Sequence, residues 1–348
     1  MVGSLKQARA AFVKAPVGKL VSLLLVLLIV YVIFVLGTRI IAGGHSYFIQ
    51  IFVFGLGNGA IYALIALGYT MVYGIIELIN FAHGDLFTLG GFISLYLLPF
   101  LGADESKGGT AAIILPLILV LLATMAICGA VNVTIERVAY RPLRRAPRLA
   151  PLITAVGMSF VLEGLMFLWK GPFNLHYPNL LPTTTIPIGE GASISLKDIF
   201  VILIAAILMI VLSLFTNRSR LGKAMRATAQ DQDATELMGI DINRTIAATF
   251  FIGAVLAGAG GMIFGLYFNT VVVDLGFSAG LFAFTAAVFG GIGNIPGAAL
   301  GGLLIGLTRS FWDGYFESAW ADVVIFAILI LVLVFRPTGL LGMRVPEK

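Results

Sequence analysis

The sequence has few charged residues. Only 11% of its 348 residues are Asp, Glu, Lys or Arg, whereas a soluble domain usually carries about 25%. In contrast, 59% of the residues are hydrophobic and the mean hydropathy is +1.04. Such a chain cannot cover itself with a charged, hydrated surface. The composition therefore excludes an ordinary soluble domain and indicates a protein that crosses a membrane several times.

Cysteine and the common motifs of enzymes are also scarce. Cys128 is the only cysteine, so no disulfide can form within the chain. There is no G-x-x-x-x-G-K-[ST] for nucleotide phosphates and no H-E-x-x-H for zinc. "GLGNGA" (55–60) imitates a dinucleotide motif, but it lies inside an apolar segment and does not follow a strand. We therefore expect no catalytic residues, no metal site and no cofactor in this chain.

Ten apolar segments predict an all-α protein with about ten transmembrane segments. A helix needs about 20 residues to cross the bilayer, and most segments reach that length. Two segments, 280–291 and 297–309, are too short to cross alone, and we expect them to form one excursion into the membrane and back. The ten lie at roughly 20–42, 47–73, 81–101, 111–135, 150–169, 196–216, 245–268, 280–291, 297–309 and 321–335.

Lysine and arginine predict the orientation of these segments. Most of the 22 basic residues lie before residue 20, in 136–148, in 217–244 and after residue 335. Cytoplasmic loops carry an excess of such residues, and ten passes with both termini in the cytoplasm put all four regions on that side. The net charge of +5 therefore reflects topology and does not indicate a nucleic-acid partner.

The ten passes divide into five and five. A repeat with an odd number of passes must be inverted in the membrane, as in many transporters. "FTLGG" in the third segment and "AVFGG" in the eighth agree with such a repeat. The alternative is that glycine-rich helices resemble one another by composition alone.

The first 46 residues form a basic arm followed by an apolar run from Leu20 to about Leu36. A signal peptide usually has only about 7–15 apolar residues, so we expect an extra transmembrane helix that is retained. The transmembrane domain then covers 47–342 and includes a cytoplasmic loop at 217–244. Residues 343–348 form a C-terminal tail.

Small residues recur every four positions along several segments, and the chain contains 41 glycines. Such faces let helix backbones approach closely. Packing is the plain interpretation, although helices that line a narrow pathway would use the same residues. The glycines assigned to packing are Gly55, Gly59, Gly253, Gly261, Gly265, Gly302 and Gly306.

Polar residues within apolar segments are costly unless they are paired or functional. Asn80 is a candidate helix cap and Asp85 suits a first helical turn; the alternative is a polar lining of the transport route. Asn294 and Pro296 predict a helix start, in a glycine-rich break that would place helix ends near substrate or form a simple turn. The residues that we expect to face a pathway are Asn58, Asn80, His83, Asp85, Glu163 and Asn294.

Two polar stretches remain. The stretch from Lys170 to Asp198 contains four prolines and would be an external docking surface or a stiff connection. The loop 217–244 reads NRSRLGKAMRATAQDQDATELMGIDINR, with apolar anchor residues at Leu221, Met225, Leu237 and Met238. This pattern predicts a helix that lies on the membrane surface or docks into a partner.

Within this loop, "DATELMG" (233–239) resembles the E-A-A-x-x-x-G loop of permeases in ATP-binding cassette importers, with Asp in place of Glu and Thr in place of the second Ala. Three longer stretches resemble the permeases of branched-chain amino acid importers of the LIV type. They are "IYALIALGYTMVYGIIELINFAHGD" (61–85), "AVFGGIGNIPGAALGGLLIGL" (287–307) and "FRPTGLLG" (335–342). The resemblance runs from about Ile49 to Gly342.

The resemblance implies a permease subunit in the bacterial inner membrane that moves hydrophobic amino acids into the cytoplasm. It implies four partners besides membrane lipid: two cytoplasmic ATP-binding subunits, a second related permease, and a periplasmic or lipid-tethered binding protein. An importer of urea or short amides shares the motifs and is the alternative; a secondary transporter that works without ATP is another. The residues implied to couple to the ATPase are Arg226, Asp233, Ala234, Thr235, Glu236, Leu237, Met238 and Gly239.

Overall fold

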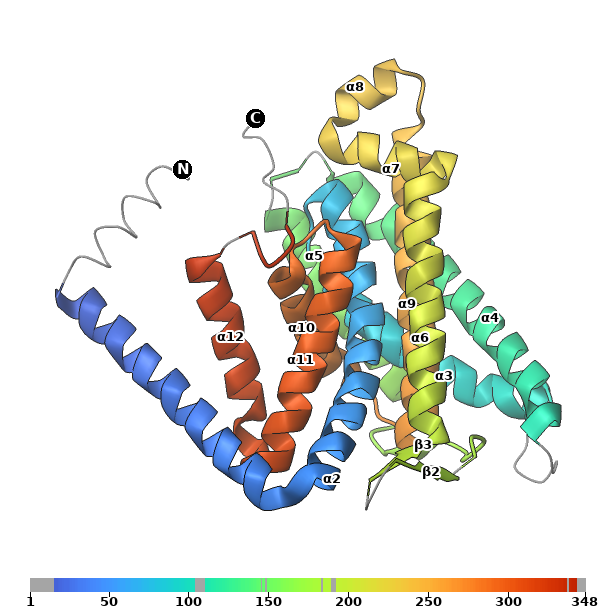
Figure 1. Cartoon of the computed structure of the whole chain (residues 1–348). Helices are drawn as coiled ribbons and strands as arrows, with labels where there is room; N and C mark the ends of the chain where they lie inside the picture. The colour runs from blue at the N-terminus through green and yellow to red at the C-terminus, as the bar shows by residue number, and fades with distance from the viewer. Residues whose placement is uncertain are drawn as a thin grey trace.

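The computed structural model describes residues 16–103, 110–144, 146–147, 149–182, 184–188, 192–336 and 338–342. Its helices form an elongated bundle with two short β-ribbons at one end (Figure 1). Within these residues, six helices are long and apolar enough to cross a membrane. The chain is thus an all-α polytopic membrane protein, as predicted. The start of the basic arm, to residue 15, and the tail 343–348 lie outside the described residues.

The first two predicted segments are the two arms of α2 (Pro16–Ile76), which are separate helices that meet at a kink. The bend lies at Gly44, whose φ of 77° is a conformation that glycine adopts without steric cost. The first arm leans away from the bundle in Figure 1, and the second runs through its centre. The bend is tied to the end of α11, because Tyr47 donates a hydrogen bond to Gly314 O at 2.8 Å and Arg39 donates to Tyr315 O.

The remaining elements follow in simple order. Each β-ribbon is antiparallel, with β1 paired to β4 and β2 paired to β3. The helices and strands are α3 (Ala82–Phe100), α4 (Thr110–Ile135), the π-helix η1 (Glu136–Tyr140), the 3₁₀-helix η2 (Arg141–Leu143), α5 (Leu149–Lys170), β1 (Leu175–His176), β2 (Thr185–Pro187), β3 (Ser193–Ser195), α6 (Leu196–Arg218), α7 (Arg220–Gln230), α8 (Gln232–Leu237), α9 (Ile242–Phe268), β4 (Thr270–Val271), α10 (Leu275–Gly290), α11 (Ile295–Tyr315), the 3₁₀-helix η3 (Ser318–Trp320) and α12 (Ala321–Phe335).

The two segments predicted to be short are longer than expected. In place of 280–291 and 297–309, α10 has 16 residues and α11 has 21. The prediction for α11 was wrong because its apolar run stops near Arg309, whereas the helix continues past Asp313. The Arg309 side chain pairs with Asp313 at 3.7 Å and with Asp322 of α12 at 3.2 Å. Paired charges of this kind can continue a helix near the membrane surface.

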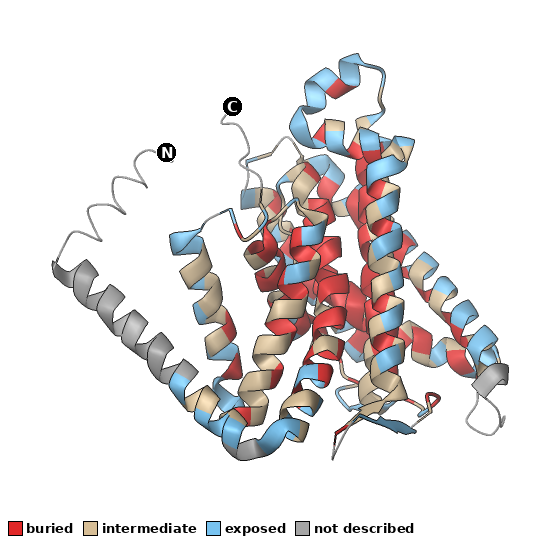
Figure 2. Cartoon of the chain, viewed as in Figure 1, coloured by how far each residue is buried: buried red, intermediate tan, exposed pale blue. Residues whose placement is uncertain are grey.

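The core lies where the second arm of α2 packs against α9, α3 and α11. Figure 2 shows the buried residues gathered in these central helices. In contrast, α4, α5, α6 and α12 expose most of their apolar surface, including Phe160 and Leu168 of α5. Apolar faces of this size require lipid or another membrane subunit to cover them.

The predicted packing glycines lie at close helix contacts. A methyl group at Gly306 would overlap the backbone of Gly59 on α2, and one at Gly302 would overlap Ala63. Helices α2 and α11 therefore touch backbone to backbone, which larger residues would prevent. The other five face a neighbouring residue: Gly55 at Leu307, Gly59 at Leu303, Gly253 at Gly68, Gly261 at Phe87 and Gly265 at Tyr177.

Candidate functional site

The polar loop 217–244 folds into two short helices that we call the α7–α8 projection (residues 219–241). It extends beyond the ends of the bundle helices, at the end opposite the β-ribbons (Figure 1). The helices α7 and α8, and α9 after them, each begin with a side-chain cap. Ser219 Oγ accepts from Gly222 N at 2.8 Å, Asp231 Oδ1 accepts from Ala234 N at 3.0 Å, and Asp241 Oδ1 accepts from Arg244 N at 3.1 Å.

The "DATELMG" sequence forms α8 and the turn that ends it. Gly239 has a φ of +81°, and the N–H of Ile240 donates to Thr235 O at 3.3 Å. The N–H of Gly239 donates to Glu236 O at 2.9 Å, which completes a glycine-ended helix stop. Gly239 thus makes the tight turn that ends α8. Thr235, where the importer loops have alanine, is buried and donates from Oγ1 to Asp231 O at 2.5 Å.

The tip of the projection exposes two large apolar side chains. Leu237 is 89% exposed and Met238 is 82% exposed. Asp233, Ala234 and Glu236 are exposed beside them. A short helix that is fixed at both ends and apolar at its tip is suited to insert into a partner's groove.

Arg226 lies elsewhere on the projection. Its guanidinium donates to Thr216 O and, at 3.4 Å, to Asn217 O, near the end of α6. Met225 is buried against the bundle. Arg226 therefore satisfies terminal carbonyls of α6 and anchors α7, which sets the position of the tip.

A buried polar cluster joins α3 to α5. Asp85, in the first turn of α3 as predicted, is 1% exposed and accepts a hydrogen bond from the Ser159 hydroxyl. Glu163 lies one helical turn after Ser159 on α5 and is half-buried. His83 is fully buried, and neither of its ring nitrogens has a hydrogen-bond partner among the described residues. Its ring packs edge-on to Tyr69, with centroids 4.8 Å apart.

The other predicted pathway residues join different pairs of elements. Asn58 of α2 donates to Ser310 Oγ of α11 at 3.4 Å. Asn294 caps α11, as predicted, by accepting from Gly297 N at 3.1 Å, and it also donates to Leu341 O at 2.6 Å.

The cap predicted for Asn80 was wrong. The cap position of α3 is occupied by Phe81, and the side chain of Asn80 makes no capping bond there. Its Oδ1 instead accepts from the Tyr140 hydroxyl of η1 at 2.7 Å. A long-range partner on another helix has displaced the local bond, which a sequence pattern cannot indicate.

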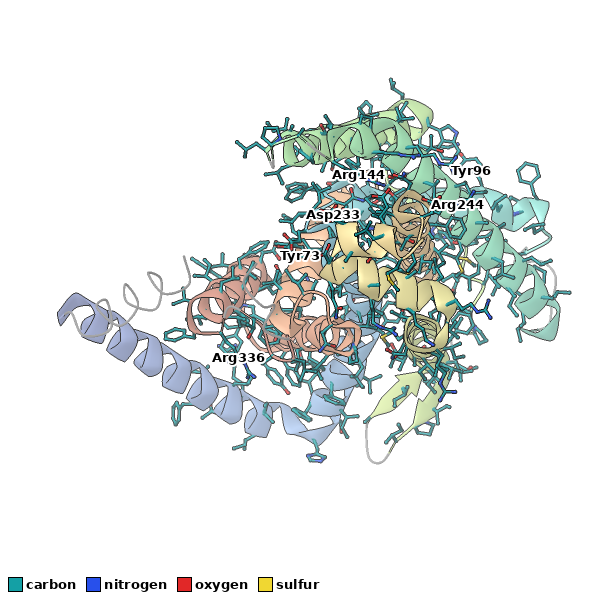
Figure 3. All side chains as sticks on the ribbon, turned by 90° about the horizontal axis from the view of Figure 1, so that it is seen from above. Tyr73, Tyr96, Arg144, Asp233, Arg244 and Arg336 are labelled. Atoms are coloured by element: carbon teal, nitrogen blue, oxygen red, sulfur yellow. The ribbon has the colours of Figure 1, made fainter. Side chains whose placement is uncertain are left out.

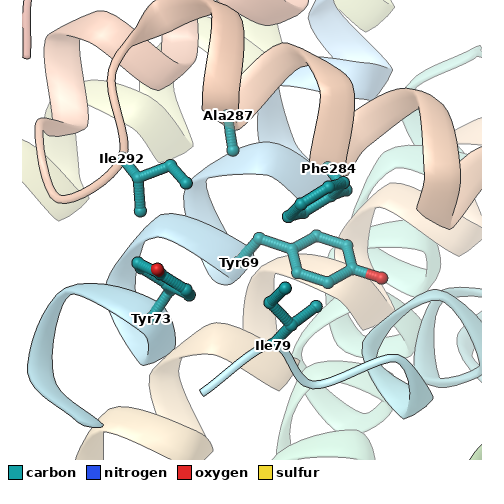
Figure 4. Close-up of a pocket in the computed structure, with 6 residues that line it drawn as sticks. All are labelled: Tyr69, Tyr73, Ile79, Phe284, Ala287 and Ile292. Atoms are coloured by element: carbon teal, nitrogen blue, oxygen red, sulfur yellow. The ribbon is translucent and has the colours of Figure 1, made fainter. Parts of the chain in front are cut away.

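Two cavities lie at the end of the bundle that carries the projection. The smaller, of about 10 Å³, is apolar and lies between α2, the connection that follows it and α10 (Figure 4). Tyr69, Tyr73 and Phe284 line it, and it has room for about one water molecule. The larger, of about 230 Å³, is lined by Glu136, Arg144 and Gln232, among others. Glu136 and Arg144 lie in the predicted cytoplasmic region 136–148, and nothing local in the sequence indicates that they pair at the wall of a cavity.

The fold and these surfaces define a class of protein: a polytopic membrane protein with a helical projection at one end. The sequence comparisons make this class specific. The family described as "Branched-chain amino acid transport system / permease component" matches residues 51–333. The chain belongs to this family.

Two curated relatives match the chain over nearly their whole length, and a third matches over part of it. The permease protein BraD of the high-affinity branched-chain amino acid transport system of Pseudomonas aeruginosa is 45% identical over 309 residues, which cover 87% of this chain and 98% of BraD. LivH of Escherichia coli K12, the permease protein of a system of the same description, is 40% identical over the same shares. E. coli LivM, another permease protein of this kind, is 29% identical over 156 residues, 43% of this chain and 36% of LivM. No solved structure matches the chain. The protein is thus a branched-chain amino acid transport permease.

Proposed function

We propose that this chain is the membrane-spanning subunit of an ATP-binding cassette importer and carries branched-chain amino acids into the cytoplasm of a bacterium. Family membership and the 45% identity to BraD support the substrate class. The inner membrane would be its location, with ten passes, an inverted five-plus-five repeat and both termini in the cytoplasm. Residues 47–342 would be the permease domain, and the first arm of α2 would be an addition to it.

The α7–α8 projection is the proposed coupling element. The observation that carries this assignment is the exposure of Leu237 and Met238 at the tip of a helix that is otherwise fixed by caps. These side chains would fill an apolar groove in an ATP-binding subunit, and Asp233 and Glu236 would meet basic residues at its rim. Closure of the ATPase would then move α7 and, through Arg226, the end of α6.

The remaining partners would cover the other surfaces. A second permease of the LivM kind would pack on part of the apolar faces of α4, α5, α6 and α12, and lipid would cover the rest. A periplasmic or lipid-tethered binding protein would dock at the opposite end, where the β-ribbons lie (Figure 1). Asn58, Asn80, His83, Asp85, Glu163 and Asn294 remain the residues that we predict to face the pathway.

Co-purification tests the coupling assignment. The double substitution Leu237→Asp and Met238→Asp, and separately Gly239→Arg, should lower the recovery of ATP-binding subunits about tenfold or more, because central apolar contacts carry most of the binding energy of an interface. Leu237→Met is the matched control and should retain both co-purification and substrate-stimulated ATP hydrolysis. If the Asp and Arg variants still co-purify with the ATP-binding subunits and keep substrate-stimulated ATP hydrolysis, the projection is not the coupling element. Uptake that continues after ATP depletion would instead show a secondary transporter.

A further inference from the structure

The larger cavity lies between the end of α2, the η1–η2 segment and the α7–α8 projection. It has a volume of about 230 Å³. Figure 3 looks onto this end of the molecule and labels Arg144, one of the residues that line the cavity. The walls of the cavity combine charged side chains, Glu77 and the ion pair Glu136–Arg144, with the apolar side chains of Ile76, Leu78 and Phe250.

The ion pair leaves bonding capacity unused. Arg144 donates from Nη2 to Glu136 Oε1 and from Nη1 to Asn243 Oδ1 at 2.8 Å. Glu136 is only 1% exposed, yet its Oε2 has no hydrogen-bond partner among the described residues. A buried carboxylate oxygen without a donor is costly. The guanidinium also keeps N–H groups beyond the two that these bonds use.

The backbone is irregular at the same point. Helix α4 widens into the π-helix η1 at Glu136–Tyr140 and then tightens into the 3₁₀-helix η2. π-helical turns are rare and occur frequently at functional sites. This one places Glu136, Tyr140 and Arg144 on one wall of the cavity. Tyr140 also holds Asn80, whose buried Nδ2 is a second polar atom without a partner among the described residues.

A carboxylate oxygen that needs a donor, a cation with free N–H groups and an apolar wall match the three parts of an aliphatic α-amino acid. We propose that this cavity binds one such amino acid from the cytoplasm and that its occupancy slows the transport cycle. Glu136 Oε2 accepts from the ammonium, Arg144 donates to the carboxylate, and Ile76, Leu78 and Phe250 contact the side chain. The proposal rests on the proposed function, because the ligand is the product of that transport.

The lining also explains how occupancy reaches the ATPase. Gln232, the first residue of α8, forms part of the cavity wall. A bound amino acid therefore contacts both the bundle and the helix that carries Leu237 and Met238. Any movement of the projection relative to the bundle breaks these contacts, so the ligand stabilises the present arrangement over the one that follows it in the cycle.

Binding is tested directly with the assembled transporter in lipid nanodiscs, without binding protein. Radiolabelled leucine should bind, and three competitors should each be about tenfold weaker or more: 4-methylpentanoate lacks the ammonium, isopentylamine lacks the carboxylate and glycine lacks the side chain. Ala146→Leu fills the cavity without changing its charge and should abolish this binding. Ala150→Leu is the matched control, because Ala150 does not line the cavity, and it should bind leucine as the wild type does.

Inhibition is tested in proteoliposomes that contain ATP and either leucine or no amino acid. Luminal leucine should lower the initial rate of binding-protein-dependent isoleucine uptake about fivefold or more in the wild type and in Ala150→Leu. The ratio of the two rates should be near one in Ala146→Leu. Leu78→Phe, which fills the cavity from its other wall, gives the same test if Ala146→Leu does not assemble.

Inhibition that persists unchanged in both Ala146→Leu and Leu78→Phe would overturn the proposal. A wild-type uptake rate that is the same with and without luminal leucine would also overturn it. Equal competition by glycine would overturn the apolar part of the site. Wild-type vesicles that show no ATP-driven uptake at all would overturn the proposed function instead. The nanodisc measurement would then still decide whether the cavity takes an amino acid.

Discussion

Single glycines decide how closely the central helices of this permease approach. Gly306 of α11 lies directly against Gly59 of α2, where a side chain would meet backbone atoms. Gly239 has a different task, because its φ of +81° ends α8 and turns the chain back to the bundle. The same residue type therefore supplies close approach in one place and an unusual backbone conformation in another.

Gly306→Val should destabilise the bundle by about 1–3 kcal/mol, because overpacking pushes α2 and α11 apart. The measurement is the melting temperature of the purified protein in detergent, which should fall. Gly157→Val on α5 is the control, because an added methyl group there meets nothing within 4 Å. Equal melting temperatures for the two variants would contradict the backbone contact between α2 and α11.

At the scale of elements, the α7–α8 projection depends on its caps more than on its length. Helix α8 has only six residues, which is too short to be stable by its own hydrogen bonds. Asp231 supplies its first bond, and the stop at Gly239 supplies its last. The cap at Asp231, the helix stop at Gly239 and the hydrogen bond of the buried Thr235 hydroxyl together fix the tip.

Asp231→Ala should therefore loosen α8, because an N-cap is worth about 1 kcal/mol. Hydrogen exchange should become faster in 232–238 and stay unchanged in the buried part of α9. Asp233→Ala is the control, because it removes the same kind of side chain from a position that does not cap the helix. Hydrogen exchange in α8 of this variant should stay close to that of the wild type. Protection in α8 that is the same in both variants would show that the cap does not hold this helix.

At the scale of the whole molecule, the two ends of the bundle differ in chemistry. One end carries the projection, the ion pair Glu136–Arg144 and the basic loops; the other carries the β-ribbons and the exposed Phe173. Burial lowers the pKa of the Arg144 guanidinium from its usual value, and the neighbouring Glu136 acts in the opposite direction. Arg144 thus keeps its positive charge in a partly buried site because Glu136 lies beside it.

Cysteine labelling tests the proposed orientation. Cys128 is buried, so the native chain gives a low background with a membrane-impermeant maleimide. In spheroplasts that produce the chain without its ATP-binding subunits, Phe173→Cys should be labelled in the intact state, whereas Met238→Cys should be labelled only after permeabilisation. Rapid labelling of position 238 in intact spheroplasts would place the projection outside and contradict the topology.

Composition and apolar runs were enough to predict a polytopic helical membrane protein, because lipid exposure demands long apolar helices whatever their arrangement. Local signals were also sufficient where the physics is local, as in the cap at Asn294. The length of α11 was mispredicted because the pairing of Arg309 with Asp313 and Asp322 cancels the cost of a charge within the run. Hydropathy along the chain does not record such partners.

The sequence by itself determined the family, the helical class and the chemistry of the projection, since motifs and periodicity depend on neighbours along the chain. Only the tertiary structure decided that Asn80 bonds to Tyr140, that Arg226 anchors α7 to the end of α6, and that Glu136 and Arg144 meet Gln232 around one cavity. These contacts join residues from separate helices, and their geometry follows from how the helices pack. A cavity is the space that packing leaves, and no single segment specifies it.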